Sequence, residues 1–165
     1  MFSTIGNMIP FPRKGQGVAN YLISDGLRNA SQMHVWLRLN PGRGIKEVTD
    51  YLNDYNVRNG INKWNFPFSM TAADIATYHP DLVDPDSLLN CGRNAQVAIE
   101  EMFEKPDGMK KEAFYDEALL EITDVLGTTP MAHEDTLCIF TRFLHNVCKT
   151  GEYKNNSGFV PTVVL

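Results

Sequence analysis

Two amphipathic stretches separated by a glycine and a proline constrain the fold of this chain more strongly than any other feature of its sequence. Apolar residues recur three or four positions apart in residues 109–127 and again in residues 128–151, which is the spacing of one buried helical face. Gly127 is a natural C-cap for the first stretch, and Thr129 followed by Pro130 is a typical helix start for the second. The sequence therefore predicts two helices joined by a short turn.

Two further helices are predicted upstream of this pair. Thr71 can cap a helix that Pro80 stops, because proline cannot continue the hydrogen-bonded helical backbone. Residues 84–105 carry a stripe of apolar side chains at helical spacing. We therefore expect three to four helices to cluster in residues 71–151.

Residues 34–70 show a different pattern, in which two alternating segments flank a helical one. Apolar and polar side chains alternate in residues 34–39 and again in residues 61–70, as they do in half-buried strands. Residues 45–57 repeat apolar side chains every three or four positions, which predicts an amphipathic helix. Pro67 lacks the N–H group that a central strand donates, so the second strand is expected at a sheet edge.

The predicted fold class is therefore α+β, with a small β-α-β unit followed by the helical cluster and an extended arm at each end. The 165 residues fit a single domain, and the 43% apolar share can supply its core without a metal or a disulfide. Its expected parts are an N-terminal arm (1–17), an α/β part (18–70), a helical part (71–151) and a C-terminal arm (152–165).

Apolar runs and cysteine positions indicate the compartment. The apolar runs are much shorter than the roughly 18 residues that a membrane-spanning helix needs, so we expect no membrane partner. The three cysteines, Cys91, Cys138 and Cys148, are widely separated and form no CxxC pair. This arrangement favours reduced thiols in an intracellular, cytoplasmic protein.

The best candidate for a metal site combines His133, Cys138, His145 and Cys148. Zinc sites usually contain paired ligands at short spacing, and the step from 133 to 138 does not place two ligands on one helical face. A Cys–His hydrolase built on Cys138 is the next interpretation, but buried structural thiols are far more common than reactive ones. We therefore assign no catalytic residue, no metal ligand and no cofactor.

The two parts of the sequence carry opposite net charge. Residues 1–65 contain eight Lys/Arg and four Asp/Glu, whereas residues 66–165 contain seven Lys/Arg and sixteen Asp/Glu. One interpretation is a basic half that binds nucleic acid through cations and a stacking aromatic ring. The other is head-to-tail attraction between copies of the chain. The residues proposed for nucleic-acid binding are Trp36, Arg38, Arg43, Lys46 and Lys63.

The glycine-rich loop of residues 40–44 is a second candidate binding site. It contains Arg43 and leads into a predicted helix, whose free N–H groups could attract a phosphate. The loop matches neither the dinucleotide-binding motif nor the nucleoside-triphosphate motif, and Glu47 in the first helical turn already complements the helix dipole. An ordinary tight turn is the simpler interpretation.

Apolar residues occur near both ends of the sequence, where disorder is more usual. Pro10 and Pro12 exclude a helix from the N-terminal arm, and Pro161 favours addition of the C-terminal arm to a sheet edge. Such segments are covered either by their own subunit or by a neighbouring one. The residues expected to mediate assembly are Phe2, Ile5, Met8, Ile9, Phe159, Val160, Val163, Val164 and Leu165.

These patterns lead to the hypothesis of a non-enzymatic structural or assembly subunit. It would associate with itself or dock in a larger particle, for example a viral or phage particle, through apolar arms and complementary charge. The alternative is an intracellular nucleic-acid-binding or regulatory protein that acts through residues 13–65. An enzyme is the third hypothesis, because no convincing catalytic motif is present.

Overall fold

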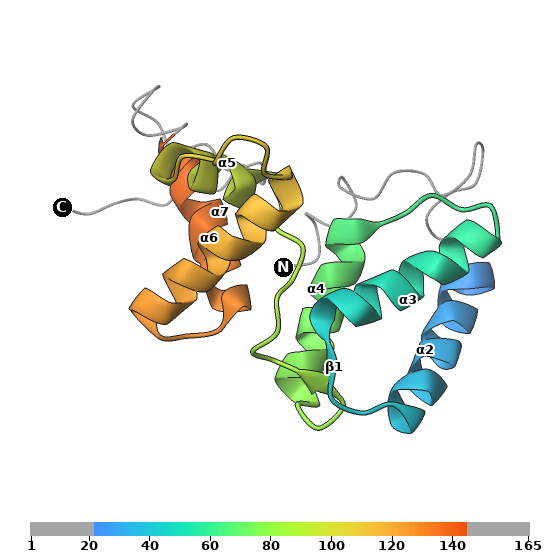
Figure 1. Ribbon diagram of the computed structural model, residues 1–165. Coiled ribbons are helices and arrows are strands. Elements are labelled where there is room, and N and C mark those ends of the chain that lie inside the picture. The colour runs from blue at the N-terminus through green and yellow to red at the C-terminus, as the bar shows by residue number, and fades with distance from the viewer. Residues whose placement is uncertain (1–21, 145–165) are drawn as a thin grey trace, which may run out of the picture. The chain divides into compact units, whose positions relative to one another are not determined.

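The computed structural model describes residues 22–144, which form two compact units that divide after Asn90 (Figure 1). This part of the chain is mostly helical and contains a small parallel sheet of two strands. It is therefore broadly α+β, with far more helix than strand. The predicted boundary between residues 70 and 71 falls inside a helix of the first unit.

Helices and two very short strands make up residues 22–90. In chain order they are a π-helical turn η2 (Leu22–Gly26), α2 (Leu27–Leu39), β1 (Arg43–Gly44), α3 (Ile45–Arg58), α4 (Asn65–Tyr78) and β2 (Val83–Asp84). Figure 1 shows α2 on one side of α3 and α4 on the other, and α3 contacts both. The strands pair in parallel, with Arg43 opposite Val83 and Gly44 opposite Asp84. Both strands lie outside the two segments in which strands were predicted.

Helix α3 forms the centre of this core and confirms the helix predicted at residues 45–57. Its buried apolar side chains are Ile45, Val48, Leu52 and Tyr55. Full burial of one such side chain stabilises the fold by roughly 1.5–3 kcal/mol. The helix ends at Arg58 with Asn59 as its C-cap, and Gly60 follows with a φ of 67°, a left-handed conformation that glycine adopts readily.

Residues 34–39 form the last turns of α2, so the strand predicted there is wrong. The alternating pattern predicted that Val35, Leu37 and Leu39 share one buried face. In the structure Leu37 is buried, whereas Val35 and Leu39 are exposed. Leu37 shares its buried face with Met33, four residues earlier, which is helical spacing. A run of six residues is too short for periodicity to separate a strand from a helix.

Most of the second predicted strand is also helical, because residues 65–70 belong to α4, which begins at Asn65. Pro67 is the third residue of this helix, in the first turn, where N–H groups have no helical partner and proline is tolerated. Buried Phe68 and Ala72 lie four residues apart on one face. Thr71, the expected cap, lies inside the helix, and its hydroxyl donates to the Pro67 carbonyl at 3.0 Å.

Residues 91–144 contain three helices. The turn that joins the last two confirms the helix end and helix start predicted at Gly127, Thr129 and Pro130. The helices are α5 (Arg93–Met102), α6 (Lys111–Leu126) and α7 (Pro130–Phe143), and α7 packs against the other two. Gly127 ends α6 with a left-handed φ of 70°. Thr129 caps α7 by accepting the Ala132 N–H at 3.3 Å, and Pro130 takes the first helical position.

The helix predicted over residues 84–105 is shorter than expected. Residues 85–92 form turns and extended chain, and only residues 93–102 are helical. The core of this unit consists of Ala95, Ala98, Ile99, Phe114, Tyr115, Ala118, Leu119 and Leu137. Leu119 of α6 and Ile99 of α5 are completely buried, so both helices contribute to one core, but Met102 and Val125 of the predicted apolar stripes are exposed.

Both predicted arms, with all nine of their apolar assembly residues, lie outside the described residues. The end of the last predicted helix, residues 145–151, lies outside them as well. Between residues 22 and 144, every helix is too short or too polar to cross a lipid bilayer.

Candidate functional site

One side of α2 presents a row of apolar side chains to solvent. Leu27, Val35 and Leu39 are 65%, 57% and 76% exposed, and Ile23 in the preceding turn is 71% exposed. These positions are multiples of four residues apart, and exposed Ser31 completes the series. We call Ile23, Leu27, Ser31, Val35 and Leu39 the α2 ridge. An exposed row of apolar side chains of this kind is a candidate interaction surface.

A shallow, open hollow of about 500 Å³ extends the α2 ridge toward α3. It is lined by Ser31, Gln32, Val35, Trp36, Leu39 and Tyr51. Three of these residues belong to the α2 ridge, and Tyr51 comes from α3. A small-molecule site usually encloses most of its ligand, whereas this hollow is open.

Trp36 and Tyr51 form a fixed aromatic wall of the hollow. Their ring centroids are 4.4 Å apart and their planes differ by 15°, which is a stacked arrangement. The Tyr51 hydroxyl also donates to the Gln32 carbonyl at 3.3 Å. Aromatic pairs of this kind contribute about 0.5–1.5 kcal/mol beyond their buried area. The wall is therefore in place before any partner arrives, which reduces the entropic cost of binding.

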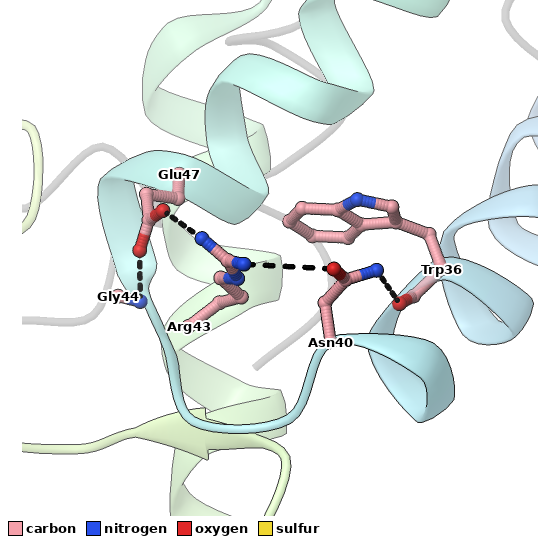
Figure 2. A network of polar contacts seen from close by, with 5 residues as sticks. All are labelled: Trp36, Asn40, Arg43, Gly44 and Glu47. Atoms are coloured by element: carbon pink, nitrogen blue, oxygen red, sulfur yellow. Dashed lines mark hydrogen bonds and ion pairs between the residues drawn. The ribbon is translucent and has the colours of Figure 1, made fainter.

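A chain of polar contacts fixes the turn between α2 and α3, next to the hollow (Figure 2). Asn40 donates its side-chain amide to the Trp36 carbonyl at 2.9 Å and has a longer contact of 3.5 Å with Arg43. The Arg43 guanidinium pairs with the Glu47 carboxylate at 2.9 Å. The other Glu47 oxygen accepts the Gly44 N–H at 2.9 Å, so this carboxylate caps α3.

This capping occupies the donors that a phosphate site would need. Glu47 accepts the Gly44 N–H, and the Ser87 hydroxyl accepts the Ile45 N–H at 2.8 Å. The hydrogen bond from Gly44 is the main reason that the pKa of Glu47 lies below its usual value, and Arg43 adds to the effect. A carboxylate at the helix N-terminus opposes a second anion there. The structure therefore favours the ordinary tight turn.

The five residues proposed for nucleic-acid binding do not form one surface. Trp36 and Arg38 are two positions apart on α2, so at about 100° per residue they point to nearly opposite sides of the helix. Arg43 is held in the ion pair at the start of α3. Lys46 is partly buried in the first turn of α3, whereas Lys63 is exposed in the loop beyond the opposite end of that helix. The Asn40 side chain links Arg43 to the backbone carbonyl of Trp36.

The boundary after Asn90 places Asp74, Asp81, Asp84 and Asp86 in the same unit as the basic residues of the first half. Residues 22–90 contain six Lys/Arg and eight Asp/Glu, and residues 91–144 contain five Lys/Arg and eleven Asp/Glu. A nucleic-acid-binding domain is normally strongly basic, and neither of these two described ranges is. Locally, α2 differs from its surroundings. It exposes Arg28, His34 and Arg38 and contains no Asp or Glu.

Glu134 and Cys138 form a buried polar pair within residues 91–144. One Glu134 oxygen accepts the Gly92 N–H at 2.9 Å and the Cys138 thiol at 3.3 Å. The other oxygen has no hydrogen-bond partner among the described residues. Burial and the adjacent Glu134 carboxylate raise the pKa of the Cys138 thiol to about 12. A reactive cysteine needs the opposite shift, so this thiol is unsuited to nucleophilic chemistry.

The histidine candidates do not assemble a metal site in the described part of the chain. His133 is buried, and its Nε2 lies 2.8 Å from the Thr128 hydroxyl. His145 and Cys148 lie outside the described residues. Within residues 22–144, no group of three or more His, Cys, Asp or Glu side chains is arranged to hold a metal ion.

The α2 ridge is the functional candidate that sequence reasoning missed. Its signal was present, because Ile23, Leu27, Val35 and Leu39 recur at multiples of four positions. The signal becomes visible only when residues 22–39 are treated as a helix, and the last six of these were assigned to a strand. No known protein-family model matches this chain, and no curated protein or solved structure is significantly similar to it.

Proposed function

We propose that this protein is a non-enzymatic assembly subunit that associates with itself through the apolar face of α2. The observation that carries the proposal is the α2 ridge, with the aromatic hollow beside it. A second copy of the same chain is the partner that we propose for this surface. Through such contacts the protein would build an oligomer or occupy a place in a larger particle.

Burial of the α2 ridge supplies a driving force of the right size for association. Full burial of one large aliphatic side chain contributes roughly 1.5–3 kcal/mol, and the ridge contains four that are more than half exposed. Association costs an estimated 4–15 kcal/mol in lost translational and rotational freedom. The ridge can therefore offset a substantial part of this cost, and the preformed Trp36–Tyr51 wall reduces the remaining cost of ordering side chains.

Charge supports a second copy as the partner. Helix α2 itself carries exposed Arg28 and Arg38 and no acidic residue, whereas residues 91–144 carry more than twice as many acidic as basic groups. A second copy can therefore present acidic groups to the basic side chains of α2. Complementary potentials of this kind accelerate encounter and disfavour other arrangements.

The apolar terminal arms belong to the same proposal, although the sequence alone supports them. An extended arm that crosses to a neighbouring subunit gains main-chain hydrogen bonds and side-chain pockets. Deletion of residues 158–165 is then expected to lower the mass of the oligomer without changing the helical content. Light scattering measures the first quantity and circular dichroism the second.

The central test is the substitution Val35→Glu in the full chain, with Val57→Glu as the matched control. Both valines are about half exposed on helices of the same unit, but only Val35 lies in the ridge and the hollow. We expect sedimentation velocity to show an oligomer for the wild type and for Val57→Glu, and a monomer for Val35→Glu, because a buried unpaired carboxylate opposes association.

A monomeric wild-type protein would overturn the proposal, and so would a Val35→Glu protein that keeps the wild-type mass. The same samples test the alternative function. Binding to single-stranded RNA or DNA that weakens steeply with salt and is lost in the double variant Arg38→Ala, Arg43→Ala would favour a nucleic-acid-binding protein instead.

A further inference from the structure

Helix α7 exposes a second apolar surface, made of two rows of side chains. The first row is Ala132, Thr136 and Phe140, the second is Asp135, Ile139 and Phe143, and all six are exposed. Residues four apart on a helix form ridges, and a partner ridge packs into the space between two of them. The Thr136 hydroxyl donates to the Ala132 carbonyl at 2.9 Å, so it needs no partner outside the helix. We call these six residues the α7 face.

We propose that the α2 ridge of one copy packs between the two rows of the α7 face of a second copy. This inference rests on the self-association proposed above and names the surface that covers the ridge. The small residues Ala132 and Thr136 in one row allow the two helices to approach closely, while Ile139 and Phe143 in the other supply apolar area. The hollow beside the α2 ridge can receive one of the phenylalanine rings.

The two surfaces match in length. Helix α2 has 13 residues and α7 has 14, which at 1.5 Å per residue gives lengths of about 20 and 21 Å. The α2 ridge from Leu27 to Leu39 spans about 18 Å, and the α7 face from Ala132 to Phe143 spans about 17 Å. A contact between them can therefore cover the exposed apolar side chains of both helices.

Charge favours this pairing over contact between two α2 ridges. Pairing of α2 with itself would bring Arg28 and Arg38 of one copy near those of the other, with no acidic residue in either helix. The α7 face instead contains Asp135 and belongs to the acidic unit. In an antiparallel arrangement the start of α7 meets the end of α2, so Asp135 approaches Arg38 and the two helix dipoles oppose each other favourably.

A contact between two different surfaces has a consequence for assembly. Two copies can satisfy both contacts reciprocally in a two-fold dimer, whereas copies that use the α2 ridge toward one neighbour and the α7 face toward another make a heterologous contact. Such contacts produce a closed ring or an open filament, whereas pairing of one surface with itself stops at a dimer. The proposal therefore predicts a wild-type oligomer in which every interface pairs the α2 ridge of one copy with the α7 face of another.

Complementation between two full-length variants tests this arrangement. Val35→Glu disables the α2 ridge and leaves the α7 face intact, whereas Ile139→Glu disables the α7 face and leaves the ridge intact. We expect each variant alone to be monomeric and their equimolar mixture to form a 1:1 heterodimer with one functional interface. Native mass spectrometry, with one variant labelled with ¹⁵N, identifies the heterodimer. Leu120→Glu, on the exposed side of α6, is the control that should keep the wild-type assembly.

The outcomes separate this inference from the proposed function. A wild-type oligomer that Val35→Glu abolishes but Ile139→Glu leaves intact would overturn the α7 face as the partner and retain self-association through α2. Two monomeric variants that fail to combine would also overturn it, provided that circular dichroism shows both to be folded. A monomeric wild-type protein would instead remove the proposed function itself.

Discussion

Helices α3 and α5 begin in the same way, but the carboxylates that cap them come from different places. Each follows a glycine N-cap, Gly44 or Gly92, with extended backbone and no side chain that could cap the helix. Glu47 caps α3 from within its own first turn. The Gly92 N–H instead donates a hydrogen bond to the carboxylate of Glu134, a residue of α7 that lies 42 positions away. The same local requirement is thus met by a local contact in one unit and by a tertiary contact in the other.

The two carboxylates differ in the direction of their pKa shifts. Glu47 is exposed, and the hydrogen bond from Gly44, supported by Arg43, lowers its pKa. Glu134 is only 1% exposed, and burial raises its pKa although the Gly92 N–H acts in the opposite direction. A hydrogen bond to a carboxylate favours its ionised form, whereas loss of hydration disfavours it. The comparison shows that position in the fold decides which effect is larger.

The start of α4 shows that a side chain from another helix can bond a backbone N–H at a helix start without carrying a charge. The amide oxygen of Asn53, on α3, accepts the buried Trp64 N–H at 2.7 Å just before α4 begins. The amide nitrogen of Asn53 donates to the side-chain oxygen of Asn65 at 2.8 Å. Because this amide does not titrate, the contact is independent of pH, unlike the two carboxylate caps.

The largest loss of stability is expected from removal of Glu134, which bonds α5 from another helix, rather than from removal of Glu47, which caps its own helix. Glu134→Ala leaves the buried Gly92 N–H without a partner, and such a loss together with a small cavity costs about 2–3 kcal/mol of stability. Urea denaturation followed by circular dichroism measures the change. Glu101→Ala, at an exposed position of α5, is the control and should remain within about 0.5 kcal/mol of the wild type. If Glu134→Ala lost no more stability than Glu101→Ala, the hydrogen bond from Gly92 to Glu134 would not contribute to stability as proposed.

A pH series tests the sign of the Glu134 shift. Because the folded-state pKa is raised above the ordinary value of 4.5, the folded protein binds a proton more readily than the unfolded chain. The contribution of Glu134 to stability is therefore complete below pH 4.5 and decreases as the pH rises through the raised pKa.

Glu134→Gln removes this titration and keeps an oxygen that can accept the Gly92 N–H. We expect the stability of Glu134→Gln relative to the wild type to increase as the pH rises from 4.5 to 7.5. Urea midpoints for both proteins across this range give the difference directly. A difference that is constant with pH, or that decreases, would contradict the raised pKa.

The smallest loss of stability is expected from removal of Glu47, the carboxylate that caps its own helix α3. Glu47→Ala removes a carboxylate that solvent already stabilises in the unfolded chain, so we expect a loss of about 0.5–1 kcal/mol near neutral pH. Because the pKa of Glu47 is lowered, this contribution is present above its ordinary pKa and disappears as the pH falls through the lowered value. Asp50→Ala, at an exposed position of the same helix, is the control. A loss that persists in acid would show that the cap does not act through charge.

Prediction from the sequence succeeded where the deciding contacts are close together in the chain. The turn from α6 to α7 was predicted because Gly127, Thr129 and Pro130 act on adjacent backbone groups. Prediction failed at residues 34–39 and 61–70, where short alternating runs fit a strand and a helix equally well. There the decision depended on packing against α3, which the sequence pattern does not contain. The α2 ridge was missed for the same reason.

The sequence by itself determined the centre of α3, the boundary between α6 and α7, and the Glu47 cap, because each depends on residues within a few positions of one another. Only the tertiary structure decided that residues 34–39 are helical, that Glu134 reaches α5, and that Val35 and Leu39 are exposed while Leu37 is buried. The physical reason is that burial depends on which distant segments meet. Burial in turn sets both the pKa of a carboxylate and the apolar surface that remains for a partner.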